Sequence, residues 1–301
     1  MIKLNDIRYL RIGTANLEFA VEYCTQIIGL QLVGREGKAA YFRSDKTGVR
    51  GDTRDHTLVY FEGDPRDNTI GFDLEDRERL DFVAAELEKA GHPVHQGTQQ
   101  ECELRRVKDF IATRDPTGNK IEIVVRPYHS GVRYFPSRDA GITHFSHIGL
   151  RTSNAPKDEA FWTCICNARV SDWIGDAPLL RISTVHHSLA LFPSPYPGVQ
   201  HINHQVEDID DVMRSWYFLR EKGVKIVFGP GRHATSSAVF LYFEGPDKMV
   251  YEYSVGVKHI QPEEEASYRP RQFPFTPESF CIWGSRPDIP EFQADQGKQN
   301  V

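Results

Sequence analysis

The sequence has few cysteines, no long apolar segment and no excess of positive charge. Its five cysteines are an odd number in a chain of 301 residues, which does not fit a disulfide framework. No apolar run approaches the ~20 residues of a transmembrane helix, so we expect no membrane partner. The formal net charge of −6 argues against nucleic acid as a partner.

The N-terminal segment MIKLNDIRYLRIGT is polar and leads directly into a strand-like pattern. It lacks the positively charged head, the apolar middle and the small-residue cleavage site of a signal peptide, so we expect a cytoplasmic protein. Apolar residues make up 40% of the chain and charged residues 26%, a balance typical of a globular protein. The length is sufficient for two domains.

Cys164 and Cys166 are close enough in sequence to hold a soft metal ion together. They lie in the helix-like segment EAFWTCICNA, and no second Cys/His pair follows at the spacing of a zinc ribbon. We therefore predict that both are small residues of the hydrophobic core.

Four segments share one pattern, in which a short strand and a polar break precede a helix that ends near a glycine. The first and third segments align at IGTAN and GLRTSN, and the second and fourth align at LED and VED. Antiparallel strands follow, joined by tight turns such as DPTG and GPDK. This repeat predicts an α+β fold of four tandem βαβββ modules, with two modules in each curved sheet and the helices outside. The four segments begin at Ile7, Asn68, Phe145 and Val199.

Two of the predicted helices have clear periodicity. Apolar residues recur at helical spacing in 80–87 and in 212–219. Gly91 and Gly223 follow and predict where these helices end.

The four modules divide the chain into two domains and a tail. We predict an N-terminal domain at 1–133 and a C-terminal domain at 140–258, joined by the linker SGVRYFPSRDAG. Residues 259–301 are rich in proline and lack periodicity, which predicts an extended tail that packs on the body. The tail residues that we expect to be buried are Phe273, Phe275, Phe280, Ile282 and Trp283.

The two domains differ at two of three matching positions. The aligned pairs are Tyr9 and His147, Thr69 and His201, and Glu122 and Glu252. Two histidines and a carboxylate on separate strands form the facial triad that suits non-haem Fe(II), whereas tyrosine, threonine and glutamate form a poor Fe(II) site. Core packing gives no reason for histidine at both matching strand starts. We therefore predict that only the second domain binds a metal ion.

Other histidines compete for the ligand positions. A single histidine in a strand is more often a packing residue than a ligand. His144 and His204 each lie three residues from a predicted ligand, so strand alternation directs them to the opposite face.

Further titratable side chains accompany the triad. His186 and His187 begin HHSLALF, His233 lies in GPGRHATSS, and Tyr242 lies in FLYFEGPD. Histidine suits proton transfer because its ordinary pKa is about 6.5, and a tyrosine hydroxyl can bind an oxyanion. The simpler alternatives are that His233 caps loop backbone groups and that Tyr242 is a core aromatic residue.

These motifs, in this order, resemble the type I extradiol catechol dioxygenases of the vicinal oxygen chelate superfamily, such as 2,3-dihydroxybiphenyl and catechol 2,3-dioxygenases. The motifs are HIGL, HHSLAL, GVQHINHQVEDIDD, GPGRHATSS, FLYFEGPDK and VYEYS, and the resemblance extends over nearly the whole chain. It implies that each domain is an incompletely closed mixed β-barrel. It also implies Fe(II), or less often Mn(II), at His147, His201 and Glu252.

The resemblance implies extradiol (meta) cleavage of a catechol-type diol with O2 in the degradation of aromatic compounds, by a homo-oligomer. It implies that His187 is the acid–base residue, with His186 as its rival, and that His233 and Tyr242 bind the catecholate oxygen or later intermediates. ATSS follows His233, where some members that take bicyclic diols have an Asn-Asp pair, so the size of the diol stays open. The expected pocket residues are His186, Gly149, Trp173, Ile174, Phe192 and Thr235.

Two other functions fit parts of the pattern. One is an oxygenase resembling 4-hydroxyphenylpyruvate dioxygenase, which uses a similar triad on a 2-oxo acid but typically lacks the His187 and His233 pair and ends in a long helix. The other is a non-catalytic aromatic-binding protein of the same superfamily, which usually has one short domain without the triad.

Overall fold

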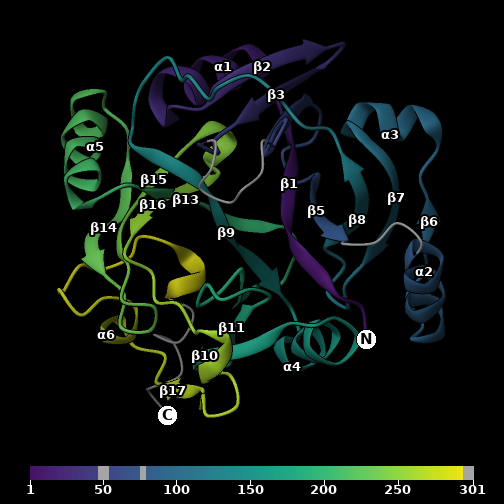
Figure 1. The fold of residues 1–301 in the computed structure, drawn as a ribbon. Helices are drawn as coiled ribbons and strands as arrows, with labels where there is room; N and C mark the ends of the chain where they lie inside the picture. The colour runs from purple at the N-terminus through teal and green to yellow at the C-terminus, as the bar shows by residue number, and fades with distance from the viewer. Residues whose placement is uncertain (47–53, 75–78, 294–301) are drawn as a thin grey trace.

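The computed structural model describes residues 1–46, 54–74 and 79–293, and it contains two mixed β-sheets (Figure 1). The first sheet has eight strands in the order β2-β3-β4-β1-β5-β8-β7-β6. Its strands are β1 Leu4–Thr14, β2 Gln31–Glu36, β3 Ala39–Arg43, β4 Leu58–Glu62, β5 Asn68–Leu74, β6 His95–Gln96, β7 Val107–Arg114 and β8 Lys120–Pro127.

The second sheet has nine strands in the order β14-β15-β16-β13-β9-β12-β11-β10-β17. Eight of them repeat the arrangement of the first sheet, and the ninth, β17, comes from the C-terminal tail and pairs in parallel with β10. The strands are β9 Ile142–Thr152, β10 Arg169–Ile174, β11 Ala177–Arg181, β12 Leu189–Pro193, β13 Val199–Val206, β14 Ile226–Arg232, β15 Val239–Glu244, β16 Val250–Val255 and β17 Arg271–Phe273.

Both sheets are built from the same module, in which a strand, a helix and three further strands follow one another. The last strand of a module lies parallel beside the first, as β4 beside β1 and β12 beside β9. The two modules of each sheet join through their first strands, which pair antiparallel as β1 with β5 and β9 with β13. The predicted α+β fold of four βαβββ modules in two domains is therefore confirmed, while the domain boundaries stay predictions.

The longer helices lie around the outside of the sheets (Figure 1). Both predicted helix ends are confirmed, because α2 ends at Lys89 before Gly91, with φ of +86°, and α5 ends at Glu221 before Gly223, with φ of +68°. Glycine adopts this left-handed backbone without a Cβ clash. None of the helices in the described ranges is both long and apolar enough to cross a membrane. The helical segments are α1 Leu17–Glu22, η1 Tyr23–Ile28, α2 Leu80–Lys89, α3 Gln99–Arg105, α4 Ala155–Ala160, η3 Phe161–Ile165, α5 Ile209–Glu221, η4 Pro246–Lys248, η5 Pro262–Glu264, α6 Pro277–Phe280 and η6 Pro290–Phe292.

One helix, α3, is absent from the predicted pattern. It begins with a capping box, in which the Thr98 side chain accepts a hydrogen bond from the Glu101 N–H and the Glu101 carboxylate accepts one from the Thr98 N–H. This Thr-x-x-Glu spacing is the sequence signal for the helix start. The helix is important for the first domain because it carries Arg105 to Glu122.

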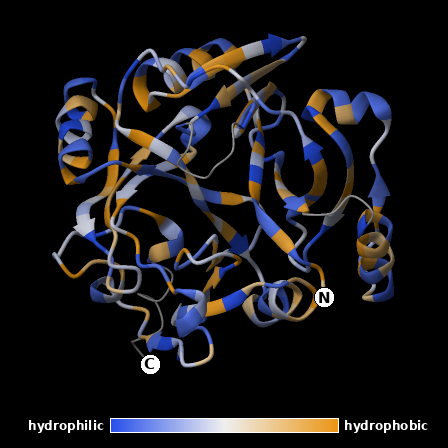
Figure 2. Cartoon of the chain, viewed as in Figure 1, coloured by the Kyte–Doolittle hydropathy of each residue, from blue (hydrophilic) through white to orange (hydrophobic). Residues whose placement is uncertain are grey.

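One hydrophobic core runs through both domains. The Phe72 ring of β5 contacts Trp162 of η3, with 5.3 Å between the ring centroids, and the hydroxyls of Tyr60 and Tyr251 form a hydrogen bond of 2.7 Å. Hydrophobic and hydrophilic residues alternate along the strands (Figure 2), as expected when one face of a sheet packs on the core. The two sheets are therefore packed against each other as well as joined by the linker.

The tail packs on the second domain only in part as predicted. Phe280 is buried, and Phe273 and Phe275 are half-buried, but Ile282 and Trp283 are 58% and 51% exposed. The prediction that these last two are buried is wrong, because the segment runs along the edge of β14, where the Ile282 N–H donates to the Arg232 carbonyl. The Trp283 ring lies against the Arg232 guanidinium at the surface, 5.1 Å from ring centroid to cation.

The cysteine pair shows a similar division. Cys166 is buried, as predicted, whereas Cys164 is exposed because it lies on the outer side of the π-helix η3. In the described parts of the chain, neither cysteine belongs to a group that could hold a metal ion.

His204 is a buried histidine of β13 that lies between Phe145 and Tyr251. Both of its ring nitrogens lack a hydrogen-bond partner among the described residues. Burial lowers the pKa of His204 to about 3, against about 6.5 in an unfolded chain. Below about pH 6.5 the unfolded chain therefore binds a proton that the folded chain does not bind. The stability of the fold falls as the pH decreases through this window.

We expect the variant His204→Phe, which places here the residue type of the equivalent Phe72, to be less sensitive to acid. The free energy of unfolding of the variant, relative to that of the unsubstituted protein, should increase by about 2–3 kcal/mol when the pH is lowered from 7 to 4.5. Urea unfolding of both metal-free proteins at the two pH values measures this, because the other titrating groups are common to both. If the difference in unfolding free energy between the two proteins is the same at both pH values, His204 is not buried in its neutral state.

Candidate metal centre

Three neighbouring strands of the second sheet carry the predicted metal ligands. His147 lies in β9, His201 in β13 and Glu252 in β16, and β13 pairs with both other strands. The register sets His201 opposite Gly149, two residues after His147, and sets Glu252 opposite Asn203, two residues after His201. Side chains two residues apart on a strand share a face, so all three ligands project from the same face of the sheet.

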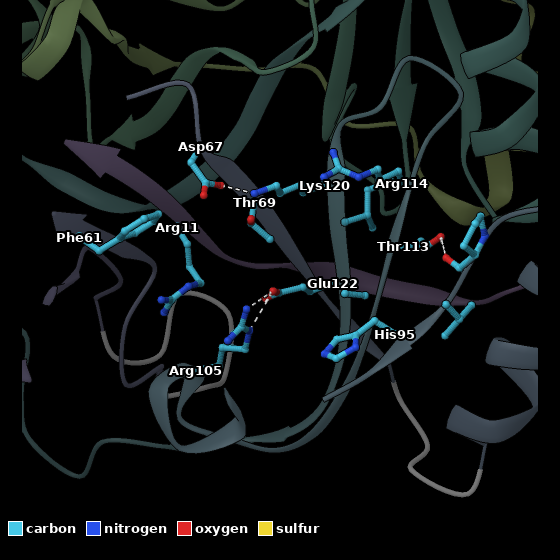
Figure 3. Close-up of a pocket in the computed structure, with 14 residues that line it drawn as sticks. Arg11, Phe61, Asp67, Thr69, His95, Arg105, Thr113, Arg114, Lys120 and Glu122 are labelled. Carbon is cyan, nitrogen blue, oxygen red and sulfur yellow. Dashed lines mark hydrogen bonds and ion pairs between the residues drawn. The ribbon is translucent and has the colours of Figure 1, made fainter. Parts of the chain in front are cut away.

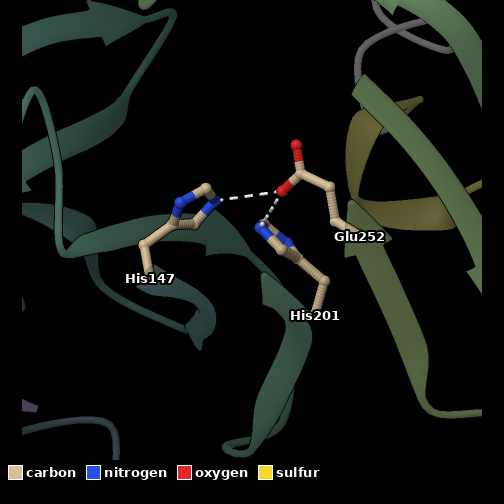
Figure 4. A group of neighbouring side chains, drawn as sticks. All are labelled: His147, His201 and Glu252. Carbon is tan, nitrogen blue, oxygen red and sulfur yellow. Dashed lines mark ion pairs between the residues drawn. The ribbon is translucent and has the colours of Figure 1, made fainter. Parts of the chain in front are cut away.

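The three side chains converge on one point (Figure 4). Nε2 of His147 lies 3.0 Å from Oε2 of Glu252, and Nε2 of His201 lies 3.5 Å from the same oxygen. One ligand atom from each residue lies within 4.8 Å of the other two. The exposed fractions of the residues are 4%, 1% and 0%, so the cluster is closed to bulk solvent. The described residues therefore form a candidate site for one divalent metal ion.

Unpaired polar atoms in the cluster test whether a metal ion fits. Nε2 of His201 and Oε2 of Glu252 are buried and have no hydrogen-bond partner among the described residues. Leaving a buried polar atom unpaired costs about 1–3 kcal/mol, and a bound cation would satisfy both atoms. Two imidazole nitrogens and one carboxylate oxygen are also the donor set that suits Fe(II) and similar divalent metals. The site therefore fits the metal that the triad implies.

Electrostatics give two of the ligands the protonation state that metal binding needs. Burial lowers the pKa of His201 to about 3, although the nearby Glu252 acts in the opposite direction. Burial alone would raise the pKa of Glu252, but the adjacent His147, His233 and His201 hold it well below its ordinary value. At neutral pH the cluster thus offers a neutral His201 and an ionised Glu252, as required for coordination.

Gln200 and Gly149 position the His201 ring. The side-chain oxygen of Gln200 contacts Nδ1 of His201 at short distance. Because that oxygen can only accept, Nδ1 carries the proton and Nε2 is left as the ligand atom. A Cβ on Gly149 would lie 2.4 Å from Nδ1 of His201 and 2.6 Å from Oε1 of Gln200. The space at Gly149, assigned to the pocket on sequence grounds, is thus occupied by these two side chains.

In the first domain, protein side chains compensate the carboxylate at the equivalent position without a metal ion. The strand registers place Tyr9, Thr69 and Glu122 at the positions of the triad, as the sequence alignment predicts. The Tyr9 hydroxyl donates to Oε2 of Glu122 at 2.6 Å, and Nε and Nη2 of Arg105 donate to Oε1 at 2.8 and 2.6 Å. The Arg105 guanidinium therefore supplies the positive charge that compensates this buried carboxylate.

A hydrogen-bonded chain of side chains leads from the tail to His187. Arg271 of β17 forms an ion pair of 2.6 Å with Asp172, which accepts a hydrogen bond of 2.8 Å from Nε2 of His186. Since Nε2 of His186 carries the proton, its Nδ1 accepts, and Nδ1 of His187 is the donor at 3.1 Å. Nε2 of His187 is then the unprotonated nitrogen. The His187 ring packs on the ligand His147, with 4.2 Å between centroids.

The state of His187 follows from its surroundings. Burial, followed by the neighbouring histidines, lowers the pKa of His187 well below its ordinary value. His187 is therefore neutral at physiological pH and carries a free basic nitrogen.

His233 and Tyr242 form a second polar pair beside the triad. Nδ1 of His233 donates to the Phe280 carbonyl at 2.8 Å, so Nε2 accepts from the Tyr242 hydroxyl at 3.2 Å. Nε2 of His233 also lies 3.4 Å from Oε1 of Glu252. Burial, reinforced by Glu252, raises the pKa of Tyr242 well above its ordinary value, so its hydroxyl stays protonated and available as a donor.

A small cavity of about 20 Å³ lies beside the triad, and we call it the metal-site cavity. Its volume is too small for an aromatic ring, so the entry of a ring requires side chains to move. Phe280 of α6 and Phe292 of η6 line it from the tail and stack with 4.8 Å between centroids. The other lining residues are Ile174, Leu179, His187, Ala190, Phe192, His201, His233, Thr235, Ser236 and Tyr242.

Some of the predicted pocket residues line the metal-site cavity, and others lie outside it. Ile174, Phe192 and Thr235 line the metal-site cavity, whereas His186 lies behind His187 and Trp173 donates its indole N–H to Glu159 at 2.9 Å, outside the lining. The lining residues that the sequence did not place at the pocket are Leu179, Ala190, Ser236, Phe280 and Phe292. Leu179 lies opposite Ala190 in the pairing of β11 with β12, and Ala190 lies opposite Gly149 in the pairing of β12 with β9. Strand alternation could therefore have placed Leu179 and Ala190 on the face of the sheet that carries the triad. Phe292 has no counterpart in the repeat.

Comparison with known proteins adds an independent observation. The family model of the Glyoxalase/Bleomycin resistance protein/Dioxygenase superfamily matches residues 6–123 and 144–253. The chain is 22% identical to biphenyl-2,3-diol 1,2-dioxygenase of Sphingomonas paucimobilis, over 88% of this chain and 92% of the relative. It is 26% identical to the iron-dependent extradiol dioxygenase of Rhodococcus jostii (strain RHA1), over 87% of this chain and 92% of the relative.

Solved structures share the fold. The crystal structure of the Mn(II)-bound glyoxalase from Novosphingobium aromaticivorans superposes with a TM-score of 0.83 at 24% identity, and the match covers 97% of this chain and 94% of that chain. The family match includes all three triad residues and every strand of the two sheets, in whole or in part, except β17. The chain belongs to the Glyoxalase/Bleomycin resistance protein/Dioxygenase superfamily, and its relatives from Sphingomonas paucimobilis and Rhodococcus jostii, which it matches over most of its length, are dioxygenases.

Proposed function

We propose that this protein is an extradiol dioxygenase that cleaves the ring of a catechol-type diol with O2, in the breakdown of aromatic compounds. The observation that carries the proposal is the buried triad of His147, His201 and Glu252 at a cavity that also presents His187, His233 and Tyr242. The dioxygenases that align over nearly the whole chain support it. A homo-oligomer in the cytoplasm remains our expectation for the assembly and its location.

We propose Fe(II) as the metal, in preference to Mn(II). Iron is named for the Rhodococcus jostii relative and Mn(II) for the Novosphingobium aromaticivorans structure, and the donor set at the site accepts either ion. When bound, a divalent ion supplies a positive charge that favours the deprotonated diol and brings the diol and O2 together.

The proton chemistry is then the task of the chain itself. Nε2 of His187 is the free base in the metal-site cavity, so it can take a proton from the substrate side and return it to an oxygen atom later. His186 is the positioning residue, since its bond to Asp172 fixes which nitrogen of His187 carries the proton.

The hydroxyl of Tyr242 and the ring of His233 serve a different role in the proposal. Both lie on the side of the cavity next to Glu252, where the Tyr242 hydroxyl can donate a hydrogen bond to a substrate oxygen and Nε2 of His233 can accept one from a substrate hydroxyl. Tyr242 is buried and the His233 side chain is 13% exposed, which limits access of competing water. His187 and this pair therefore handle the proton and the oxyanion separately.

The first test removes a ligand. We expect His147→Ala to retain less than about a tenth of the iron bound by the unsubstituted protein, because one of three ligands is lost. Both proteins are loaded anaerobically with Fe(II), and iron is measured after gel filtration. They are then given 2,3-dihydroxybiphenyl, 3-methylcatechol or catechol in air. The unsubstituted protein should form a yellow product, and His147→Ala should not.

The matched control is His144→Ala, three residues earlier on the same strand and outside the triad. It should keep both iron and activity, and circular dichroism should show that all three proteins are folded. Full iron content in His147→Ala would rule out the ligand assignment. No cleavage of any diol by the iron-loaded unsubstituted protein would rule out the proposed activity.

The second test concerns the positioning of His187. Replacing Asp172 by asparagine weakens the acceptor that holds Nε2–H of His186, because a charge-assisted hydrogen bond becomes a neutral one. We expect kcat/KM to fall by about tenfold or more, with unchanged iron content and an altered pH profile. Glu159→Gln is the control, since Glu159 binds the adjacent Trp173 outside the cavity. An unchanged pH profile and kcat/KM in Asp172→Asn would exclude the positioning role.

A further inference from the structure

The first domain contains a cavity of about 540 Å³ on the face of its sheet that carries Glu122, and we call it the N-terminal cavity (Figure 3). It lies over the positions that are equivalent to the metal site of the second domain, with Glu122 at its floor. Its volume is in the range of small-molecule sites, and it is much larger than the metal-site cavity. The proposed dioxygenase reaction uses no residue of this cavity.

The rim of the N-terminal cavity is a row of side chains across four strands. Arg11 of β1 lies opposite Thr69 of β5, Thr69 opposite Lys120 of β8, and Lys120 opposite Arg114 of β7. Residues directly opposite one another project from the same face of a sheet. Three cationic side chains and one hydroxyl therefore share this rim (Figure 3).

The second domain has the opposite charge at the same row. The equivalent residues are Gly149, His201, Val250 and Glu244. They follow from the strand pairing, in which His201 lies opposite Gly149 and Val250, and Val250 lies opposite Glu244. This row has no cation and one carboxylate, where the first domain has three cations. The two copies of the fold thus differ in charge at the rim as well as in metal ligands at the floor.

The cations of the N-terminal cavity are only partly compensated. Arg105 is paired with Glu122 at 2.6 Å, and Lys120 with Asp67 at 2.5 Å. Within the described ranges, Arg11 and Arg114 form no ion pair with a carboxylate. Nη1 of Arg11 donates to the Leu104 carbonyl at 2.9 Å, and Nη1 of Arg114 donates to the Gly118 carbonyl at 2.7 Å. These acceptors are neutral, so the cavity keeps two uncompensated positive charges.

Apolar side chains complete the walls. Phe61 lines the cavity beside the rim, Ala112 lines it opposite Glu122, and Val94 lines it from the segment before α3. The Arg11 guanidinium lies 5.6 Å from the centroid of the Phe61 ring. A ligand that fits this lining has a planar apolar body and carries negative charge.

We propose that the N-terminal cavity binds an aromatic carboxylate. The carboxylate lies at the rim and accepts hydrogen bonds from Arg11 or Arg114, and the ring lies between the apolar walls. Guanidinium groups suit this role because their planar donors match the geometry of a carboxylate. The proposal requires no metal ion and does not depend on the reaction at the second domain.

The probes are benzoate and its neutral isostere benzamide, titrated calorimetrically into the iron-loaded protein at low ionic strength. We expect benzoate to bind and benzamide to bind about tenfold or more weakly. The double variant Arg11→Gln/Arg114→Gln keeps N–H donors for the Leu104 and Gly118 carbonyls but removes both charges. Its affinity for benzoate should fall about tenfold or more, and added salt should weaken benzoate binding to the unsubstituted protein. Arg66→Gln, an exposed arginine paired with Asp64, is the control and should bind benzoate normally.

A crystal soaked with 4-bromobenzoate distinguishes this site from the metal-site cavity, because the anomalous signal of bromine locates the ligand. The proposal expects a bromine peak in the N-terminal cavity. A peak only beside the metal ion, no peak, or binding at crystal concentration only would overturn it. Equal affinity of the double variant and the unsubstituted protein for benzoate would overturn it as well.

Discussion

The register of three adjacent strands is the constraint on which the metal centre depends. Strand β13 pairs antiparallel with β9 and parallel with β16, and these pairings fix His147, His201 and Glu252 on one face within reach of a single ion. A shift of β13 by one residue would move His201 to the opposite face of the sheet. The hydrophobic core that joins both sheets opposes such a shift, because it would move the apolar residues of β13 out of that core.

The buried carboxylate at this register then requires compensation, and the two domains provide it differently. Glu252 faces two histidines whose ligand atoms are left for a cation, while Glu122 is neutralised by Arg105 and the Tyr9 hydroxyl. A buried carboxylate without a partner would be strongly destabilising, so each copy needs one of these solutions. The second domain therefore keeps ligand atoms for a metal ion, and the first domain has the cationic N-terminal cavity at the equivalent place.

The repeat in the sequence predicts the four modules and the triad, because the succession of strands and helices along the chain, and the alternation of side chains along each strand, follow from local patterns. His187 follows from the family resemblance instead, and its ring packs on His147. The sequence does not reveal that His186 is hydrogen-bonded to Asp172, or that Asp172 pairs with the tail residue Arg271, since those contacts join segments far apart in the chain. The tail has no repeat partner, so neither the addition of β17 to the sheet nor the exposure of Trp283 follows from periodicity.

We expect only the second domain to hold a metal ion. Anomalous diffraction at the iron edge, from crystals of the protein loaded anaerobically with Fe(II), locates any bound iron. One iron peak per chain is expected, bounded by His147, His201 and Glu252. The absence of iron at that position, or a peak beside Glu122 where Arg105 supplies the charge, would contradict it.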